Sequence, residues 1–503
     1  IAHDVLAELF SRTEFLRSVG LGYLALDRSA PTLSGGEAQR IRLAAQLGSN
    51  LRGVCYVLDE PTIGLHPRDN DALLETLEAL RAKGNTLIVV EHDEETIRRA
   101  DHVIDLGPGA GRQGGRVVAR GTAAELMGLQ ESITGRCLAQ PMRHARAQRR
   151  PVGPRTPAIE IEGANRHNLR QVDARFPIGR FSVVTGVSGS GKSTLAREVL
   201  LENLRRLGVN PDAAPLGCTR IRGAQAITRV LEVDQTPIGR TPRSCPATYV
   251  GFWDAIRKLF AETSEARMRG HSASRFSFNT AGGRCERCEG QGLQRVEMNF
   301  LPDVQVVCDA CGGRRFNEET LQVRFKGKNV GEVLAMSVDE AVEFFTAHHG
   351  IHHALELLAD IGLGYLCLGQ SSPTLSGGES QRIKLVTELA KARAGTTAPP
   401  GPRGVPRHTL YVLDEPTVGL HMADVDRLLG VVQRLIDSGN TVVAIEHNLD
   451  VMAEADWIVD LGPEGGAGGG RVVAAGPPDA LARASAHSHT GRYLREFMAE
   501  RGV

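Results

Sequence analysis

Three short patterns occur twice in this chain of 503 residues, in the same order each time. Leu-Ser-Gly-Gly-Glu stands at 33–37 and 375–379, Val-Leu-Asp-Glu-Pro-Thr at 57–62 and 412–417, and Glu-His at 91–92 and 446–447. A glycine-rich loop, Gly-Val-Ser-Gly-Ser-Gly-Lys-Ser at 186–193, occurs once, ahead of the second set only. A repeat of this kind predicts two related structural copies. We expect the first copy to lack the front part that the second has.

Each copy is predicted to be an α/β structure. Short apolar runs at 55–58, 86–90, 410–413 and 441–445 predict buried parallel strands. Long amphipathic runs follow Ser34 and Ser376, which are good helix N-caps. Strands that alternate with helices favour a parallel sheet with helices on its faces.

The patterns divide the chain into four regions. Residues 1–135 are interpreted as the rear part of the first copy, 158–245 and 369–503 as the second copy, and 246–368 as an insertion in the second copy. Residues 136–157 are basic and rich in proline, and we interpret them as a solvated linker rather than a nucleic-acid-binding arm. The stretch 393–408 is rich in Gly, Pro and Thr and is expected to be a surface loop.

The glycine-rich loop lies between an apolar strand pattern and a helical pattern, which is the context of a phosphate-binding loop. Its glycines let backbone N–H groups turn toward phosphate oxygens, and the next helix directs its positive end at the anion. Lys192 is predicted to neutralise the β- and γ-phosphates and Ser193 to hold Mg²⁺. The alternative is a purely structural turn. The predicted nucleotide contacts are Gly186, Ser188, Gly189, Ser190, Gly191, Lys192, Ser193 and Thr194.

The repeated acidic and histidine residues complete this chemistry. Asp414 is interpreted as an outer partner of Mg²⁺, and Glu415 as the group that orients or deprotonates the attacking water. His447 is interpreted as a switch near the γ-phosphate. Taken singly, these residues could merely cap strand ends, and only their repetition favours catalysis. Ser34, Gly35 and Gly36 place a hydroxyl and exposed amides at a helix N-terminus, which suits a γ-phosphate.

The insertion carries two cysteine pairs. Cys285 and Cys288 are separated by two residues, as are Cys308 and Cys311. This spacing is typical of a structural zinc site with four thiolates, and redox pairs are the alternative. The segment between the pairs alternates in polarity from Gly292 to Val306 and predicts a hairpin.

Arginines gather around the cysteine module. With the aromatic residues interleaved among them (Tyr249, Phe252, Trp253, Phe276 and Phe278), they indicate a nucleic-acid surface, although an ordinary solvated face is equally compatible. The predicted DNA contacts are Arg240, Arg243, Arg269, Arg275 and Arg284.

Further motifs make the sequence similar to a known family. They are Val-Asp-Gln-Thr-Pro-Ile-Gly-Arg-Thr-Pro-Arg-Ser at 233–244, Arg-Phe-Ser-Phe-Asn at 275–279, Val-Glu-Met-Asn-Phe-Leu-Pro-Asp at 296–303, and Asp-Leu-Gly-Pro at 105–108 and 460–463. With the repeats, they resemble the ATP-binding cassette (ABC) superfamily and, more narrowly, UvrA, the damage-recognition subunit of bacterial nucleotide excision repair. The resemblance covers essentially the whole chain. It matches the family's second cassette and the rear part of its first.

The resemblance implies an α/β fold with two ABC-type ATPase cassettes, the first incomplete, and a zinc-binding insertion in the second. It implies ATP, Mg²⁺ and Zn²⁺ as cofactors and head-to-tail pairing of the cassettes. One complete ATP site would then place Lys192, Ser193, Gln235, Asp414, Glu415 and His447 opposite Ser34, Gly35 and Gly36. The other site would have Asp59, Glu60, His92 and Ser376 but no phosphate loop. Gln235 would link the nucleotide to the zinc insertion.

The family further implies binding to damaged double-stranded DNA, a homodimer and a UvrB partner. The usual UvrB-binding domain is not visible in the sequence. A cytoplasmic protein of the excision and SOS responses is expected, because cysteine usage fits a reducing cytosol and no apolar run reaches about 18 residues. Zero formal net charge excludes general attraction to polyanions. A transporter ATPase subunit, a UvrA-like antibiotic-resistance paralogue and a non-catalytic truncated product remain alternatives.

Overall fold

The computed structural model describes residues 2–33, 35–47, 52–111, 114–144, 149–296, 298, 304–393 and 408–502. The chain folds into two compact units. Unit 1 contains 1–106, 117–233 and 400–503, and unit 2 contains 107–116 and 234–399. Along the described chain, each helix is too short or too polar to cross a membrane.

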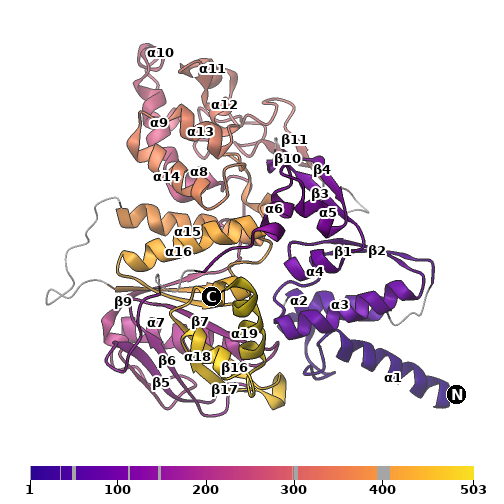
Figure 1. Ribbon diagram of the computed structural model, residues 1–503. Helices are drawn as coiled ribbons and strands as arrows, with labels where there is room; N and C mark the ends of the chain where they lie inside the picture. The colour runs from indigo at the N-terminus through magenta and orange to yellow at the C-terminus, as the bar shows by residue number, and fades with distance from the viewer. Residues whose placement is uncertain are drawn as a thin grey trace. The chain divides into compact units, whose positions relative to one another are not determined.

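The second copy is built on a six-stranded sheet in unit 1 (Figure 1). Its strand order is β17-β16-β7-β15-β14-β9, and all neighbours are parallel except β16 and β17. The strands are β7 (Phe181–Gly186), β9 (Ile227–Val233), β14 (His408–Asp414), β15 (Thr441–Ile445), β16 (Trp457–Gly462) and β17 (Arg471–Gly476). The apolar strands β7 and β15 are buried along their whole length, as the sequence predicts.

Helices and a small sheet cover this core. The three antiparallel strands are β5 (Ala158–Ala164), β6 (Val172–Pro177) and β8 (Arg220–Arg222). The helical elements are a π-helix at Thr194–Leu201, α7 (Glu202–Val209), α16 (Met422–Asp437), α17 (Leu449–Ala453), α18 (Pro478–Arg483) and α19 (His489–Arg501). Strands β5 and β6 and the π-helix contribute to one hydrophobic cluster with Val412, Val443 and Val459 of the main sheet.

The first copy, also in unit 1, has an interrupted sheet. Strands β1 (Cys55–Asp59) and β2 (Thr86–Val90) pair in parallel, and β3 (Val103–Gly107) pairs separately with β4 (Arg116–Gly121). In the second copy, β7 joins the equivalent pairs. The other elements are α1 (Ala2–Ser18), α2 (Gly35–Leu47), α3 (Pro67–Ala82), α4 (Glu94–Arg99), α5 (Ala123–Met127) and α6 (Ile133–Ala139).

The prediction of buried strands is wrong for the first copy. Val57 is 68% exposed and Ile88 50%, whereas their counterparts Val412 and Val443 are fully buried. In the second copy, the segment that carries β5, β6, β7 and the π-helix covers this face. Among the described residues of the first copy there is no equivalent segment, so alternate side chains of β1 stay exposed.

The predicted linker is partly exposed, at Pro151 and Arg155 for example, but it is anchored to the second copy at several points. Helix α6 continues to Ala139, and His144 is buried between two carboxylates of the second copy. Its Nδ1 lies 2.8 Å from Glu454 and its Nε2 3.0 Å from Asp450. The backbone N–H of Arg150 donates to Asp456 at 2.7 Å. Acidic groups around α17 therefore hold the basic segment against the domain. Residues 145–148, and most of the expected loop at 393–408, lie outside the described residues.

Unit 2 is mainly helical. Its helices are α8 (Pro246–Val250), α9 (Trp253–Glu262), α10 (Ser264–Met268), α11 (Glu318–Gln322), α12 (Val330–Leu334), α13 (Val338–Phe344), α14 (His349–Asp360) and α15 (Gly377–Arg393). The predicted hairpin is confirmed: β10 (Leu293–Val296) pairs antiparallel with β11 (Val304–Val307). A second short hairpin joins β12 (Arg324–Phe325) to β13 (Lys328–Asn329). Ser376 caps α15 as predicted, because its Oγ accepts from the Glu379 amide.

Candidate functional site: a phosphate loop facing the first copy

The glycine-rich loop turns between the end of β7 and the following helix. Gly186, Gly189 and Gly191 have φ of 130°, 73° and 106°, where a side chain would be strained. A Cβ atom at Gly186 would also lie 1.9 Å from the Leu461 carbonyl oxygen. Lys192 is buried, and its Nζ donates to the carbonyl oxygens of Gly186 (3.0 Å) and Val187 (2.9 Å). Ser193 and Thr194 begin the helix.

Several buried polar atoms around this loop have no hydrogen-bond partner among the described residues. They are Oγ of Ser188, Oγ of Ser190 and both ring nitrogens of His447. Buried polar groups are normally paired, so an unpaired group needs an explanation. A triphosphate would offer acceptors to the two hydroxyls, and the neighbouring Lys192 offers a positive charge. The residues present therefore fit a nucleotide and its Mg²⁺ at Ser193.

The acidic pair stands at the end of β14. Glu415 has a left-handed φ of 46°, and its counterpart Glu60 has 44°. This conformation is costly for a residue with a side chain and is concentrated at functional sites. Burial and the charges of Asp414 and Glu446 raise the pKa of Glu415 to about 7. A carboxylate with such a pKa suits proton transfer near neutral pH. Asp414 accepts a 3.0 Å hydrogen bond from Arg197.

A second carboxylate fixes the segment that carries His447. Oε1 of Glu446 accepts from the Thr417 amide at 2.9 Å, and its Oε2 accepts from the amides of His447 and Asn448. Glu91 binds the equivalent amides in the first copy. His447 is buried, and burial together with the charge of Lys192 lowers its pKa well below the ordinary value. The neutral ring can therefore accept a proton or a hydrogen bond at one nitrogen.

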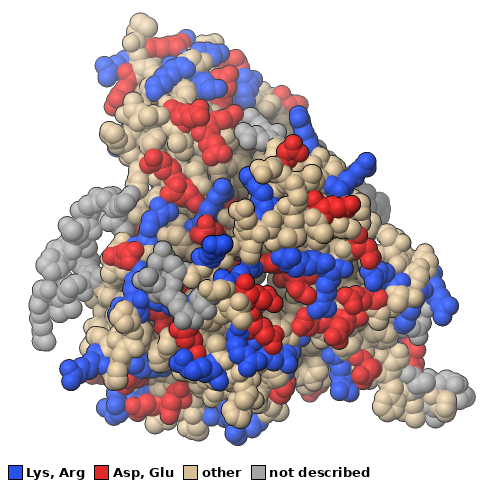
Figure 2. Space-filling view, viewed as in Figure 1, with Lys and Arg blue, Asp and Glu red and all other residues tan. Residues whose placement is uncertain are grey.

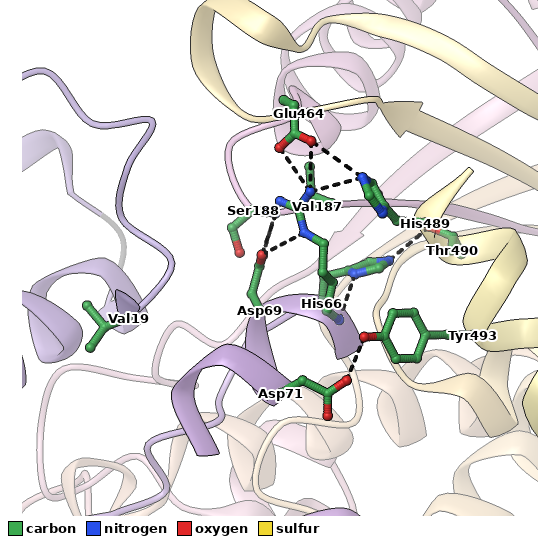
Figure 3. Close-up of polar contacts among 12 residues, drawn as sticks. Val19, His66, Asp69, Asp71, Val187, Ser188, Glu464, His489, Thr490 and Tyr493 are labelled. Atoms are coloured by element: carbon green, nitrogen blue, oxygen red, sulfur yellow. Dashed lines mark hydrogen bonds and ion pairs between the residues drawn. The ribbon is translucent and has the colours of Figure 1, made fainter. Parts of the chain in front are cut away.

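The first copy supplies the opposite wall of this site within unit 1. The Ser188 amide donates to Oδ2 of Asp69 at 3.0 Å, as Figure 3 shows. Tyr23 packs against the phosphate loop, since a Cβ atom at Gly189 would lie 2.4 Å from its ring. The Tyr23 hydroxyl donates to Glu37 on α2 at 2.6 Å. Burial lowers the pKa of Lys192, and the charge of Arg40 on α2 acts in the same direction.

The loop at 60–66, which joins β1 to α3, contacts the glutamate that follows β14 in the other copy. A Cβ atom at Gly64 would lie 2.8 Å from Oε2 of Glu415. The arrangement is reciprocal, because a Cβ atom at Gly419 would lie 3.5 Å from Oε2 of Glu60. Both glutamates and both histidines, His92 and His447, line one cavity of about 700 Å³.

The structure thus brings most of the predicted site together. Gly186–Thr194, Asp414, Glu415 and His447 come from the second copy, and α2 begins at Gly35 opposite them. Ser34 lies outside the described residues. Gln235 belongs to unit 2, where it lies beside Gly377 at the start of α15, and its role at the nucleotide stays a prediction.

Sequence reasoning missed His66, Asp69 and Tyr23. A signal for each was present, because Gly-Leu-His followed by Asp after two further residues recurs at 64–69 and 419–424, and Gly-Tyr-Leu at 22–24 and 364–366. The second tyrosine repeats the packing of the first in unit 2. Tyr365 donates to Glu379 at 2.5 Å and packs against Gly111, which corresponds to Gly466 beside Tyr23.

The four cysteines of the insertion form a metal-sized cluster. Their sulfur atoms all lie within 4.8 Å of one another, and those of Cys288 and Cys311 are 3.7 Å apart. Tetrahedral zinc with Zn–S bonds of about 2.3 Å would place sulfur atoms about 3.8 Å apart. All four residues are buried, and the Gly292 amide points at the Cys288 sulfur at 3.3 Å. Cys285, Cys288, Cys308 and Cys311 therefore fit a structural zinc ion.

The predicted nucleic-acid surface is altered in one respect. Phe252, Trp253, Phe276 and Phe278 are buried, and the last three form ring contacts in the core, so the four are not stacking platforms. Arg240 is exposed. The other arginines have acidic neighbours: Arg243 with Glu289 (3.6 Å), Arg269 with Glu265 (2.8 Å), Arg275 with Glu319, and Arg284 with Glu286 (3.7 Å). Basic and acidic side chains are interspersed over the face drawn in Figure 2.

Comparison with known proteins settles the family. The curated UvrABC system protein A of Mycobacterium bovis is 55% identical over 499 residues, covering 99% of this chain and 50% of that protein. The crystal structure of UvrA2 from Deinococcus radiodurans matches with 50% identity and a TM-score of 0.85, over 97% of this chain and 57% of that one. The chain belongs to the UvrA family. It spans about half the length of the curated relatives it matches.

UvrA membership confirms the expected fold of two ABC-type cassettes, the first incomplete, with a cysteine-rich insertion in the second. A model of ribosome-bound archaeal Pelota and ABCE1 shares the fold alone, with 17% identity and a TM-score of 0.54 over 94% of this chain and 61% of that one. No protein-family model matches the chain.

Proposed function

We propose that the chain is an ATP-hydrolysing, DNA-binding protein of nucleotide excision repair, with one complete ATP site. The observation that carries the proposal is the pairing of the phosphate loop with the first cassette, through Asp69 on Ser188 and Tyr23 on Gly189. The unpartnered hydroxyls of Ser188 and Ser190 support it, because they lie where phosphate oxygens would be bound.

The proposed mechanism assigns one task to each group. Lys192 exchanges its carbonyl partners for the β- and γ-phosphates, and the loop amides bind the remaining oxygens. Mg²⁺ at Ser193 would neutralise charge on those phosphates. Glu415 orients the attacking water and accepts its proton, and neutral His447 holds the water or the γ-phosphate. Ser34, Gly35 and Gly36, from the Leu-Ser-Gly-Gly-Glu pattern of the first cassette, would contact the γ-phosphate from the opposite side.

Family membership supports the DNA-binding part of the proposal. Damaged or distorted duplex would be recognised by its shape and deformability rather than by base sequence. The DNA phosphate backbone would be contacted by the arginines at 240, 243, 269, 275 and 284. The zinc module would stabilise the part of unit 2 that carries these arginines. Gln235 would couple that part to the bound nucleotide. Because backbone contacts release counterions, affinity should fall steeply with salt. A homodimer and a UvrB-like partner in the cytoplasm are the corresponding expectations for assembly and location.

The test is phosphate release from ATP by the zinc-loaded chain, with and without lesion-bearing duplex. Lys192→Ala should lower turnover by about a hundredfold or more, because it removes the side-chain positive charge assigned to the β- and γ-phosphates. Lys328→Ala removes an exposed lysine of unit 2 and should leave turnover unchanged. Normal hydrolysis by Lys192→Ala would refute the proposed site, and a DNA affinity independent of salt would refute the basic surface.

A further inference from the structure

His66 is fully buried at the start of α3 and forms a hydrogen bond at each ring nitrogen. Its Nδ1 accepts from the Arg68 amide at 3.2 Å, and its Nε2 lies 3.0 Å from Oγ1 of Thr490 on α19 (Figure 3). The Thr490 hydroxyl donates to Oδ1 of Asp460 at 2.7 Å. These contacts form one continuous chain of hydrogen bonds from the first cassette into the second.

The donor groups determine the direction of each hydrogen bond in this series. The Arg68 amide can only donate, so Nδ1 carries no proton and Nε2 does. The Thr490 hydrogen is directed at Asp460, so the Thr490 oxygen accepts from Nε2–H. Burial lowers the pKa of His66 to about 3, which keeps the ring neutral in this single tautomer. The series of hydrogen bonds therefore does not depend on a change in the protonation of His66 near neutral pH.

The same connection occurs a second time, in the opposite direction. Nδ1 of His421 accepts from the Ala423 amide, and its Nε2 lies 3.1 Å from Oγ1 of Thr134. Thr134 donates to Asp105 at 2.9 Å. In both copies a serine binds the other carboxylate oxygen: Ser488 on Asp460 and Ser132 on Asp105, each at 2.6 Å. The same four residue types make the same contacts in both copies, so the arrangement is a repeated feature of the fold rather than a chance contact.

The two connections end at different places. Asp460 lies on β16 opposite Thr185 of β7, and the next residue faces Gly186 at the start of the phosphate loop. Burial lowers the pKa of Lys192, and the negative charge of Asp460 opposes this by raising it. Asp105 lies on β3, which has no counterpart of β7 beside it among the described strands. Within the described residues, the His66 connection is therefore the one that reaches a phosphate loop.

We propose that His66 is a positioning residue of the complete ATP site. Through Thr490 and Asp460 it fixes the loop at 60–66 and the first turn of α3 to the base of the phosphate loop, so that Gly64 stays against Glu415 and Asp69 stays on Ser188. The inference rests on the proposed ATPase function and adds how the two halves of the site are aligned. Effects are expected on the chemical step, because both ring nitrogens of His66 are engaged by protein groups, Arg68 and Thr490.

The test uses His66→Asn and Thr490→Val in the full zinc-loaded chain. Asparagine can still cap α3 through its side-chain oxygen but cannot reach Thr490, and valine keeps the shape of threonine without its hydroxyl. Each variant should lower kcat about tenfold while KM stays within about twofold, as expected for lost alignment rather than lost binding. The double variant should be no worse than either single one, because both break the same connection. Thr490→Ser should keep near-normal kcat.

The matched controls are His421→Asn and Thr134→Val. They break the equivalent connection and should lower thermal stability by a similar amount, but kcat should not change, because that connection ends without a phosphate loop. Equal kcat losses in both pairs, or none in His66→Asn, would overturn the inference while leaving the ATPase proposal intact. A wild-type chain with no ATP turnover would overturn both.

Discussion

The two cassettes share the same strands but differ in what joins them. In the second, β7 lies between β15 and β16, and its neighbours β5, β6 and the π-helix cover the apolar face. In the first, β1–β2 and β3–β4 are separate pairs, and the matching face is exposed at Ile104 and Leu106 as well as on β1. An apolar strand pattern therefore predicts a strand, but a partner segment decides whether that strand is buried.

The largest expected effect concerns this face. Val412→Lys should destabilise the chain by about 4 kcal/mol or more, because it buries an unpaired charge in the sheet. Val57→Lys places the same charge on the exposed equivalent position and should change the unfolding free energy by no more than about 0.5 kcal/mol. Urea unfolding measures both. A large loss in Val57→Lys would show that another segment covers the first cassette in solution.

The glutamates Glu415 and Glu60, at equivalent positions of the two cassettes, give the next comparison. Glu415→Gln should lower ATP turnover by about a hundredfold, as expected for loss of a general base. Glu60→Gln, at the equivalent position without a phosphate loop, should stay within about twofold of wild type. Because Glu415 accepts a proton only when ionised and its pKa is raised to about 7, wild-type turnover should rise as pH increases through that value. Equal losses in the two variants would mean that the first cassette also hydrolyses ATP.

The cysteine-rich insertion, which lies between the phosphate loop and the Leu-Ser-Gly-Gly-Glu pattern of the second cassette, gives a further comparison. Removal of zinc with a chelator should lower hydrogen-exchange protection in β10 and β11 by about tenfold or more, because the metal stabilises the segment that binds it. Amides of β1 and β2 should be unaffected. Protection that is unchanged throughout, with the metal shown to be gone, would contradict a structural zinc site.

The smallest effect concerns the segment that joins the cassettes. Burial alone would lower the pKa of His144, but hydrogen bonds and the charges of Asp450 and Glu454 outweigh it and raise the pKa to about 9. The pKa of a histidine in the unfolded chain is about 6.5. The stability gained from protonated His144 is therefore complete below about pH 6.5 and is lost as pH rises through about 9. His144→Gln should remove on the order of 1 kcal/mol of pH-dependent stability. His487→Gln, at an exposed histidine, should leave the pH profile unchanged.

Local chemistry explains what the sequence predicted well. The phosphate loop, the cap at Ser376 and the cysteine spacing are each determined by residues close together in the chain. Contacts between segments far apart in the sequence could not be predicted in the same way. Asp69 meets Ser188 only because the cassettes pair. The buried state of Trp253 and Phe278 depends on neighbours contributed by several helices, so their aromatic character alone could not distinguish a core from a surface.

Gly64 has an evolutionary consequence. The room it leaves is filled by the carboxylate of Glu415, and Gly419 stands in the same relation to Glu60. A methyl group at Gly64 would press on the carboxylate of Glu415, which is encoded in the other half of the gene, whereas one at Gly419 would lie in ordinary van der Waals contact with Glu60. Exchange of one half between related genes should therefore succeed only when the small residue and the opposing acid are inherited as a matched pair.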